Sequence, residues 1–237
     1  MQTIALNIVL SYPIKWTKYQ VLRDIVQNFY DDIGVNNFGN LFKTEYKTNE
    51  KILILSTTSK GFSYEWLLHM GASTKQDEPG KFAGLFGEGF KVASLCALRD
   101  YNWKINIRSR NWSIEVCTLS TTVDGKLLEQ LAYNVLEDCS YSTETVLTIQ
   151  PFSKEDAGLF EEVVLGFYYP ENPLFGSCIF ENKYAAIYER SRQPKPACMP
   201  ASINMHGDGI VAFREVFVAP YLVKKLFGAH HIPLVLA

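Results

Sequence analysis

The segment 22–32 carries side chains that can do chemistry. Asp24 and Asn28 stand four residues apart and Asp31 follows three residues later, so a helix would place all three on one face. Carboxylate and amide oxygens side by side suit a hard cation such as Mg²⁺, or a water molecule that a carboxylate activates. An ordinary amphipathic helix with a solvated face gives the same pattern, so the motif needs support from elsewhere in the chain.

A second candidate is the glycine-rich stretch 84–91, which runs directly into a predicted helix. Gly84, Gly87 and Gly89 let backbone N–H groups approach a phosphate, and the helix N-terminus adds further N–H groups and a favourable dipole. The stretch is not a P-loop, since no glycine is followed by Lys and Ser or Thr. It is not a dinucleotide-binding fingerprint either, because Val92 replaces the third glycine. A flexible hinge before a helix is the alternative.

A third candidate follows Gly71. Ser73, Thr74 and Lys75 are able to contact phosphate oxygens, although a polar surface turn fits the same residues. Residues 71–87 as a whole are predicted to form a long loop, and long loops inside compact domains usually carry function.

These residues need elements to position them. Thr17 and Gln20 have the spacing of a capping box, and apolar residues then recur at helical spacing, which predicts a helix over 17–33. Shorter helices are predicted over 63–69 and 88–98. Strands are expected at 41–46, 51–56, 102–109, 113–120, 132–137 and 145–150. The order predicts an α+β fold, a two-layer sandwich with a mixed, mostly antiparallel sheet.

A break is predicted at Pro151, which divides the chain into a domain over 1–151 and the start of a second region over 152–237. Ser153 and Asp156 favour a capped helix that reaches about Gly166. A hairpin is expected over 175–192, a proline-rich loop over 193–208 and a final strand over 209–219. The last six residues are apolar, which suggests that the sequence continues beyond them.

Bulk composition limits the class of protein. The chain has 237 residues, of which 47% are hydrophobic, enough for a sizeable core. A net charge of −2 gives no global attraction to nucleic acid, although a local basic patch stays open. Five cysteines without a C-x-x-C pair indicate free thiols in a reducing compartment, hence the cytoplasm. No signal peptide or membrane span is expected.

Taken together and in their order along the chain, the motifs resemble the GHKL ATPases (gyrase, heat-shock chaperone, histidine kinase and MutL), which share the Bergerat fold. The nearest likeness is to MORC-like and related bacterial members. The family's Glu-x-x-x-Asn-x-x-Asp helix corresponds to Asp24, Asn28 and Asp31. Its Asp-x-Gly-x-Gly segment corresponds to 57–61, its Gly-x-Ser-x-Lys segment to 71–75, and its Gly-x-x-Gly-x-Gly segment to 84–89. Glu144 and Thr145 stand where a Gly-Thr pair is common.

The resemblance implies a site for ATP with Mg²⁺. Asp24 would be the catalytic base, and Asn28 would hold the metal. The nucleotide-binding residues would be Asn28, Asp31, Thr57, Gly61, Ser73, Thr74, Lys75, Gly84, Gly87, Gly89 and Thr145. Residues 71–87 would form a lid over the bound nucleotide.

Three positions depart from the family. Asp24 is one methylene shorter than the family's Glu, which moves the carboxylate by about 1 Å, and an error of that size costs about a hundredfold in rate. Thr57 replaces the Asp that accepts a hydrogen bond from adenine, so the acceptor is neutral. Ser59 replaces a glycine.

Two functions therefore stay open within the resemblance. The first is a slow ATPase or a nucleotide-dependent switch, which would be an ATP hydrolase if active. The second is an inactive pseudo-ATPase that serves as an interaction or scaffolding module, and an unrelated α+β domain is a third reading. Expected partners are a nucleotide and either a second copy or another protein, with no membrane.

Overall fold

The structure is a computed structural model, and its larger sheet has seven strands. It describes residues 1–69, 88–137, 139–181, 185–190 and 201–205. The strand order is β1-β6-β5-β4-β7-β3-β2, and every neighbouring pair is antiparallel. The strands are β1 (Gln2–Val9), β2 (Lys43–Lys47), β3 (Ile52–Thr58), β4 (Lys104–Arg110), β5 (Trp112–Val123), β6 (Lys126–Leu136) and β7 (Ser142–Gln150).

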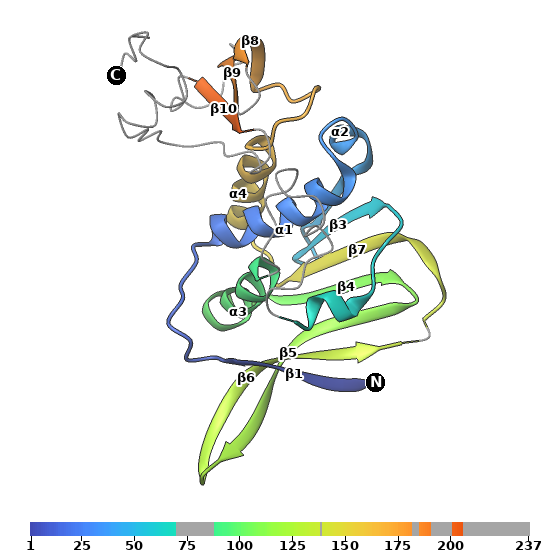
Figure 1. Ribbon diagram of the computed structural model, residues 1–237, viewed down its shortest axis with the longest axis vertical. Helices are drawn as coiled ribbons and strands as arrows, with labels where there is room; N and C mark the ends of the chain where they lie inside the picture. Colours follow the sequence, from blue (N-terminus) through green and yellow to red (C-terminus); the bar gives the residue numbers. More distant parts are fainter. Residues whose placement is uncertain (70–87, 138, 182–184, 191–200, 206–237) are drawn as a thin grey trace.

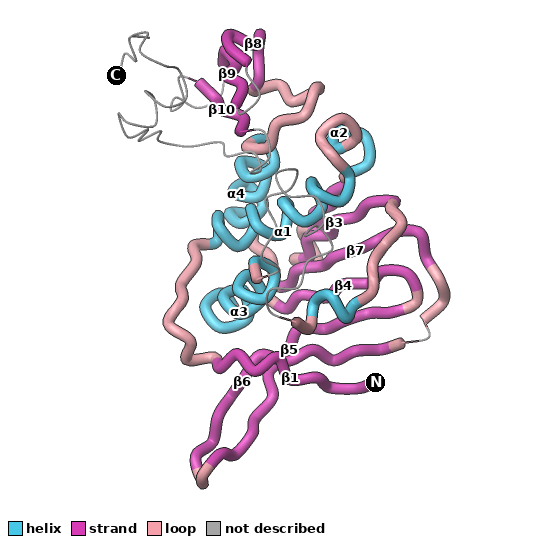
Figure 2. Tube along the Cα trace, in the orientation of Figure 1, coloured by secondary structure: helices cyan, strands magenta, loops and turns pink. Residues whose placement is uncertain are grey.

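Helices form the second layer, on one face of this sheet (Figures 1 and 2). They are α1 (Lys18–Ile33), α2 (Phe38–Leu41), α3 (Gly89–Tyr101) and α4 (Lys154–Leu165), and a 3₁₀ turn, η1 (Tyr64–Leu67), follows β3. A smaller sheet contains β8 (Phe175–Glu181), β9 (Ala185–Arg190) and β10 (Ala201–Met205) in the order β10-β9-β8. The predicted α+β, two-layer architecture is confirmed.

The start of α1 is fixed by the predicted capping box. The Gln20 N–H donates to Thr17 Oγ1 at 3.3 Å, and the Thr17 N–H donates to Gln20 Oε1 at 2.8 Å. Two of the N–H groups that a helix start leaves without backbone partners are satisfied in this way. The helix then presents a continuous buried stripe that includes Val21, Leu22 and Val26.

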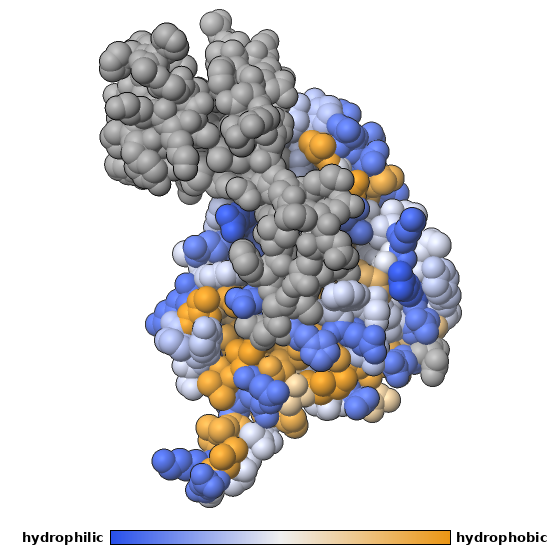
Figure 3. Space-filling view, viewed as in Figure 1, coloured by the Kyte–Doolittle hydropathy of each residue, from blue (hydrophilic) through white to orange (hydrophobic). Residues whose placement is uncertain are grey.

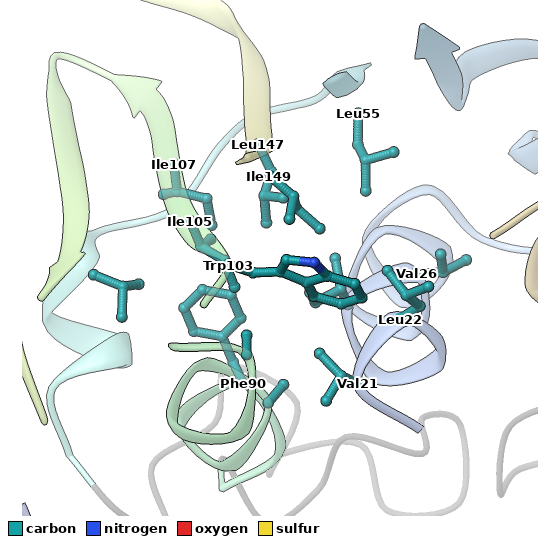
Figure 4. Packing of buried hydrophobic residues seen from close by; sticks show 14 of the residues in the cluster. Val21, Leu22, Val26, Leu55, Phe90, Trp103, Ile105, Ile107, Leu147 and Ile149 are labelled. Carbon is teal, nitrogen blue, oxygen red and sulfur yellow. The ribbon is translucent and has the colours of Figure 1, made fainter. Parts of the chain in front are cut away.

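The core lies between this stripe and the sheet. Figure 4 shows Val21, Leu22 and Val26 of α1 around the indole of Trp103, with Phe90 of α3 beside them. The sheet contributes inward-facing residues at alternating positions of β3, β4 and β7, which is the period of a strand with one covered face. These are Leu53, Leu55, Ile105, Ile107, Leu147 and Ile149.

The segment between β1 and α1 is held by the C-terminal end of α3. The guanidinium of Arg99 donates to the carbonyl oxygens of Leu10, Tyr12 and Ile14 at 3.0, 2.7 and 2.6 Å. The hydroxyl of Tyr101 donates to the carbonyl of Trp16 at 2.5 Å. These bonds fix where α1 begins relative to α3, and therefore how their facing side chains meet.

Helix α4 packs on α1 and shares its core. Phe160, Val163 and Phe167 are at most 4% exposed and belong to the same buried cluster as α1. Lys18 at the start of α1 forms a 2.5 Å ion pair with the buried carboxylate of Asp156, which also completes the predicted capping box of α4 with Ser153. The domain boundary expected after residue 151 stays a prediction.

The structure corrects several boundaries. Residues 2–9, for which no strand was expected, form β1 at the edge of the sheet. Leu41 ends α2 instead of beginning a strand, and β6 begins at Lys126, six residues before the predicted strand. The strand β10 lies inside the predicted loop 193–208. The strand predicted over 209–219 lies outside the described residues.

None of the helices in the described part of the chain combines the length and the apolar character that crossing a bilayer requires.

Candidate functional site

The carboxylate of Asp24 lies against the first residue of α3. A Cβ atom added to Gly89 would come within 2.4 Å of Asp24 Oδ1 and 2.7 Å of Oδ2, closer than any side chain tolerates. Asp24 is half-buried at this contact. The polar helix motif that contains Asp24 and the last glycine of the glycine-rich stretch therefore meet in space, although 65 positions of sequence separate them. A helix N-terminus with a glycine at its first position lets another group approach the backbone closely.

Asn28 and Asp31 continue the same face of α1. Asn28 is exposed, and its Nδ2 donates to the carbonyl oxygen of Asp24 at 2.9 Å, a bond that does not involve the amide oxygen Oδ1. Asp31 Oδ1 accepts from Gln27 Nε2 at 2.7 Å. The three predicted polar residues of α1 thus form one stripe, and Asp24 marks the part of it that touches α3.

Thr57 and Thr145 lie directly opposite one another on β3 and β7. Both are buried, at 2% and 5% exposed. Thr145 Oγ1 shares a 2.8 Å hydrogen bond with Ser109 Oγ of β4, in which either hydroxyl is able to donate. The three hydroxyls, Thr57, Thr145 and Ser109, form a row across three adjacent strands, which we call the hydroxyl row.

Gly61 lies against the hydroxyl row. Its φ is +62°, a conformation that favours glycine, and a Cβ atom there would come within 2.6 Å of Ser109 Oγ. Arg110 holds this turn, because Nε donates to the carbonyl of Lys60 at 3.0 Å and Nη2 to that of Gly61 at 2.9 Å. Trp112 Nε1 donates to the carbonyl of Phe62 at 2.8 Å.

The hydroxyl row and the N-terminus of α3 lie toward the same end of the sheet. Only residues 102 and 103 separate the C-terminal end of α3 from the first residue of β4, so α3 and β4 run in opposite directions along the layer. The N-terminus of α3 therefore points in the direction of the end of β4, where Ser109 stands. The two groups of predicted residues therefore lie toward the same end of the layer.

Other predicted residues have no described position. Ser73, Thr74, Lys75, Gly84 and Gly87 lie outside the described residues, as does the whole loop predicted over 71–87. Their proposed contacts with phosphate stay predictions from the sequence.

Two residues of this region were not predicted as site residues. Ser109 continues the inward alternation of Ile105 and Ile107 along β4, so the strand period alone was a sufficient signal. Lys91 is buried in the first turn of α3. Burial lowers the pKa of its ammonium group, and the nearby Glu88 carboxylate opposes that shift. No pattern in the sequence marks this lysine as buried.

A metal site built only from protein ligands is not found within the described ranges, where no group of three or more His, Cys, Asp and Glu residues gathers. Mg²⁺ in nucleotide sites is commonly held by one or two protein oxygens together with phosphate and water. The exposed Asn28 and the neighbouring Asp24 fit that requirement chemically.

The chain is similar to solved structures but matches no family model and no curated protein. Among solved structures, the ATPase region of Saccharomyces cerevisiae topoisomerase II is similar, with a TM-score of 0.44 and 11% identity. The same region bound to ICRF-187 (dexrazoxane) gives a TM-score of 0.44 and 10% identity. In both cases the match covers 71% of this chain and 57% of the other, so the chain spans little more than half of the structures it is similar to.

Proposed function

We propose that this chain binds a purine nucleotide with Mg²⁺ between α1, the N-terminus of α3 and the hydroxyl row. The observation that carries the proposal is the contact between Asp24 and Gly89. This contact brings the polar face of α1 together with the N-terminus of α3, which begins at a glycine. Both lie toward the end of the sheet where the inward-facing side chains change from apolar to hydroxyl. The expected ligand is ATP, on the resemblance to the GHKL ATPases and in particular to their MORC-like and bacterial members.

The phosphate end of the ligand belongs at α3. Backbone N–H groups in the first turn and the helix dipole both favour an anion there. The Asp24 carboxylate has the same sign of charge as a phosphate. Binding therefore requires that the carboxylate and the phosphate share a cation or that the carboxylate turns away. Mg²⁺ bound to Asn28 Oδ1 and to phosphate oxygens would supply that charge.

Hydrolysis is proposed to be slow. Asp24 stands at the place of the family's general base, and its side chain is one methylene shorter than the family's Glu. Because a misplacement of about 1 Å costs about a hundredfold in rate, the nucleotide would act mainly as a conformational signal. The free thiols of Cys96, Cys117 and Cys139 suit the reducing cytoplasm as the compartment for this function.

The test is a calorimetric titration of the purified chain with a non-hydrolysable ATP analogue, with and without Mg²⁺. We expect binding that depends on Mg²⁺ and that Asn28→Ala weakens at least about tenfold, because the proposed protein ligand of the metal is lost. Asn40→Ala on α2 is the matched control and should bind as the parent chain does. Absence of binding at millimolar ligand, or an unchanged affinity in Asn28→Ala, would contradict the proposal.

A specific feature also favours the second candidate, an interaction module. The β5–β6 hairpin projects from the body of the molecule and carries apolar side chains near its tip (Figures 1 and 3). Val123 and Leu127 are 50% and 69% exposed. Exposed apolar groups of this kind often mark protein contacts. If the chain is a pseudo-ATPase, Leu127→Glu should abolish self-association in sedimentation or capture of its partner, while Asp24→Ala should change neither.

A further inference from the structure

The helix-facing side of the sheet changes its chemistry at one row of residues. Across β3, β7 and β4, the first row is Leu53, Ile149 and Ile105, and the second is Leu55, Leu147 and Ile107. The third is the hydroxyl row. The step is abrupt, because each strand replaces an aliphatic side chain with a hydroxyl at the same level.

The hydrogen bonds of the hydroxyl row are incomplete. Thr145 and Ser109 bond to each other, whereas Thr57 Oγ1 is buried and has no hydrogen-bond partner among the described residues. A buried hydroxyl without a partner is costly and rare in native proteins, and an absent ligand or water is a common explanation. The Thr57 hydroxyl therefore points to a bound group that the row is built to receive.

Hydrogen bonds and close packing hold the turn on one side of the row. Gly61 leaves no space for a side chain beside Ser109, and the bonds from Arg110 and Trp112 hold the turn that contains it. The N–H of Ser59 also donates to the carbonyl of Thr143 at 3.1 Å. A surface held by several hydrogen bonds suits recognition of a flat, polar ring edge, because fewer of its groups need ordering when the ligand binds.

We propose that the hydroxyl row reads the base edge of the nucleotide and accepts the keto group of guanine as readily as the amino group of adenine. This inference rests on the proposed function, whose ligand it specifies. A carboxylate only accepts hydrogen bonds and would select an amino group, whereas a hydroxyl both donates and accepts. The Thr145–Ser109 pair keeps one further hydroxyl proton to donate, because only one of its two protons lies between the oxygens.

The first test measures binding of non-hydrolysable ATP and GTP analogues, each with Mg²⁺, to the parent chain and two variants. We expect the parent affinities to agree within about threefold. Thr57→Val should weaken both by about fivefold to tenfold, since a neutral hydrogen bond is lost. Thr57→Asp should shift the preference toward the ATP analogue by about tenfold or more, since a carboxylate accepts from the amino group and repels the keto oxygen.

The second test needs no ligand. Thr57→Val keeps the shape of the side chain and removes a hydroxyl without a partner, so its urea midpoint should equal or exceed that of the parent. Thr145→Val is the matched control and should lower the midpoint, because it breaks the bond to Ser109. A lower midpoint in Thr57→Val would show that its hydroxyl has a structural partner and would overturn the inference.

The outcomes separate the two proposals. If neither analogue binds the parent chain, the proposed function fails and the inference fails with it. If both bind but the parent prefers the ATP analogue more than about tenfold, or Thr57→Val leaves both affinities unchanged, the inference alone is overturned.

Discussion

At the level of single residues, Asp24 carries a negative charge at the N-terminus of α3, where a helix favours anions. The carboxylate gains from the dipole in the absence of ligand, and a phosphate would compete with it for the N-terminus of the helix. Its charge therefore opposes phosphate binding unless a cation intervenes. This competition makes the role of Mg²⁺ measurable through one side chain.

Asp24→Asn should tighten binding of a non-hydrolysable ATP analogue in the absence of Mg²⁺. Two like charges about 4 Å apart in a water-like medium repel by about 1 kcal/mol, so we expect roughly a fivefold lower Kd. With Mg²⁺ present the gain should shrink or reverse, and any hydrolysis should be lost. Asp32→Asn on the exposed part of α1 is the control. A weaker Mg²⁺-free affinity in Asp24→Asn would show that the carboxylate does not compete with phosphate.

The buried phenol of Tyr133 makes the free energy of unfolding depend on pH. Burial raises the pKa of its phenol, and the Ser94 hydroxyl opposes this shift only in part. Because the folded pKa lies above the unfolded value of about 10, the contribution to stability is full below that pH and is lost as the pH rises through it. Tyr133→Phe should lose less unfolding free energy than the parent between about pH 9 and pH 11. Urea unfolding across that range measures the loss of unfolding free energy in both chains. Equal losses in the parent and Tyr133→Phe would show that the pKa of Tyr133 is not the cause.

At the level of elements, the contact between α1 and α3 depends on the absence of one Cβ. Gly89 lies within van der Waals distance of Asp24, whereas Gly158 of α4 has open space around the position of its missing side chain. Both glycines are in helices, so their substitution by alanine separates the intrinsic helix preference from the packing of α1 on α3.

Gly158→Ala should stabilise the chain by about 0.5–1 kcal/mol, because alanine loses less conformational entropy in a helix. The change in unfolding free energy for Gly89→Ala should be about 1–3 kcal/mol less favourable than the change for Gly158→Ala, since the new Cβ meets the carboxylate of Asp24. The double variant Gly89→Ala/Asp24→Ala should recover most of the difference, because the opposing atoms are gone. Urea unfolding of the parent, Gly89→Ala, Asp24→Ala and the double variant measures the coupling free energy, with Gly158→Ala as the reference for helix preference. Additive effects of Gly89→Ala and Asp24→Ala would argue against the contact.

At the level of the whole molecule, one buried core extends from the sheet through α1 to α4. Phe160, Val163 and Phe167 pack in that core, and Lys18 pairs with Asp156 across the same junction. The side chain of Lys18 also lies 5.6 Å and 5.3 Å from the ring centres of Tyr101 and Trp103. Residues after 151 therefore contribute to the packing of the layer that carries Asp24.

A chain shortened to residues 1–151 should lose most of its stability, whereas one shortened to 1–174 should unfold cooperatively. Burial of three large apolar side chains contributes about 2 kcal/mol each, a sum comparable with the whole stability of a typical domain. Thermal unfolding followed by circular dichroism compares the two. If the shorter chain unfolds cooperatively at a similar temperature, the domain boundary predicted after residue 151 is supported instead.

Sequence patterns predicted an element correctly where the signal depended on neighbouring residues alone. Thr17 with Gln20 and Ser153 with Asp156 marked two helix starts that the structure confirms, because a capping box needs only neighbouring residues. The edge strand β1 was not predicted, since it depends on pairing with β6 more than 120 residues later in the chain. Its alternation was too weak to predict a strand without that partner.

For the candidate site, the sequence by itself determined which residue types are present and which helix faces carry them. It placed Asp24, Asn28 and Asp31 on one stripe and left a glycine at the start of α3. Only the tertiary structure decided that Asp24 touches Gly89, and that Thr57, Thr145 and Ser109 form one row with an unsatisfied hydroxyl. The reason is that such contacts depend on strand register and helix packing, which are set by the whole core and by no single segment.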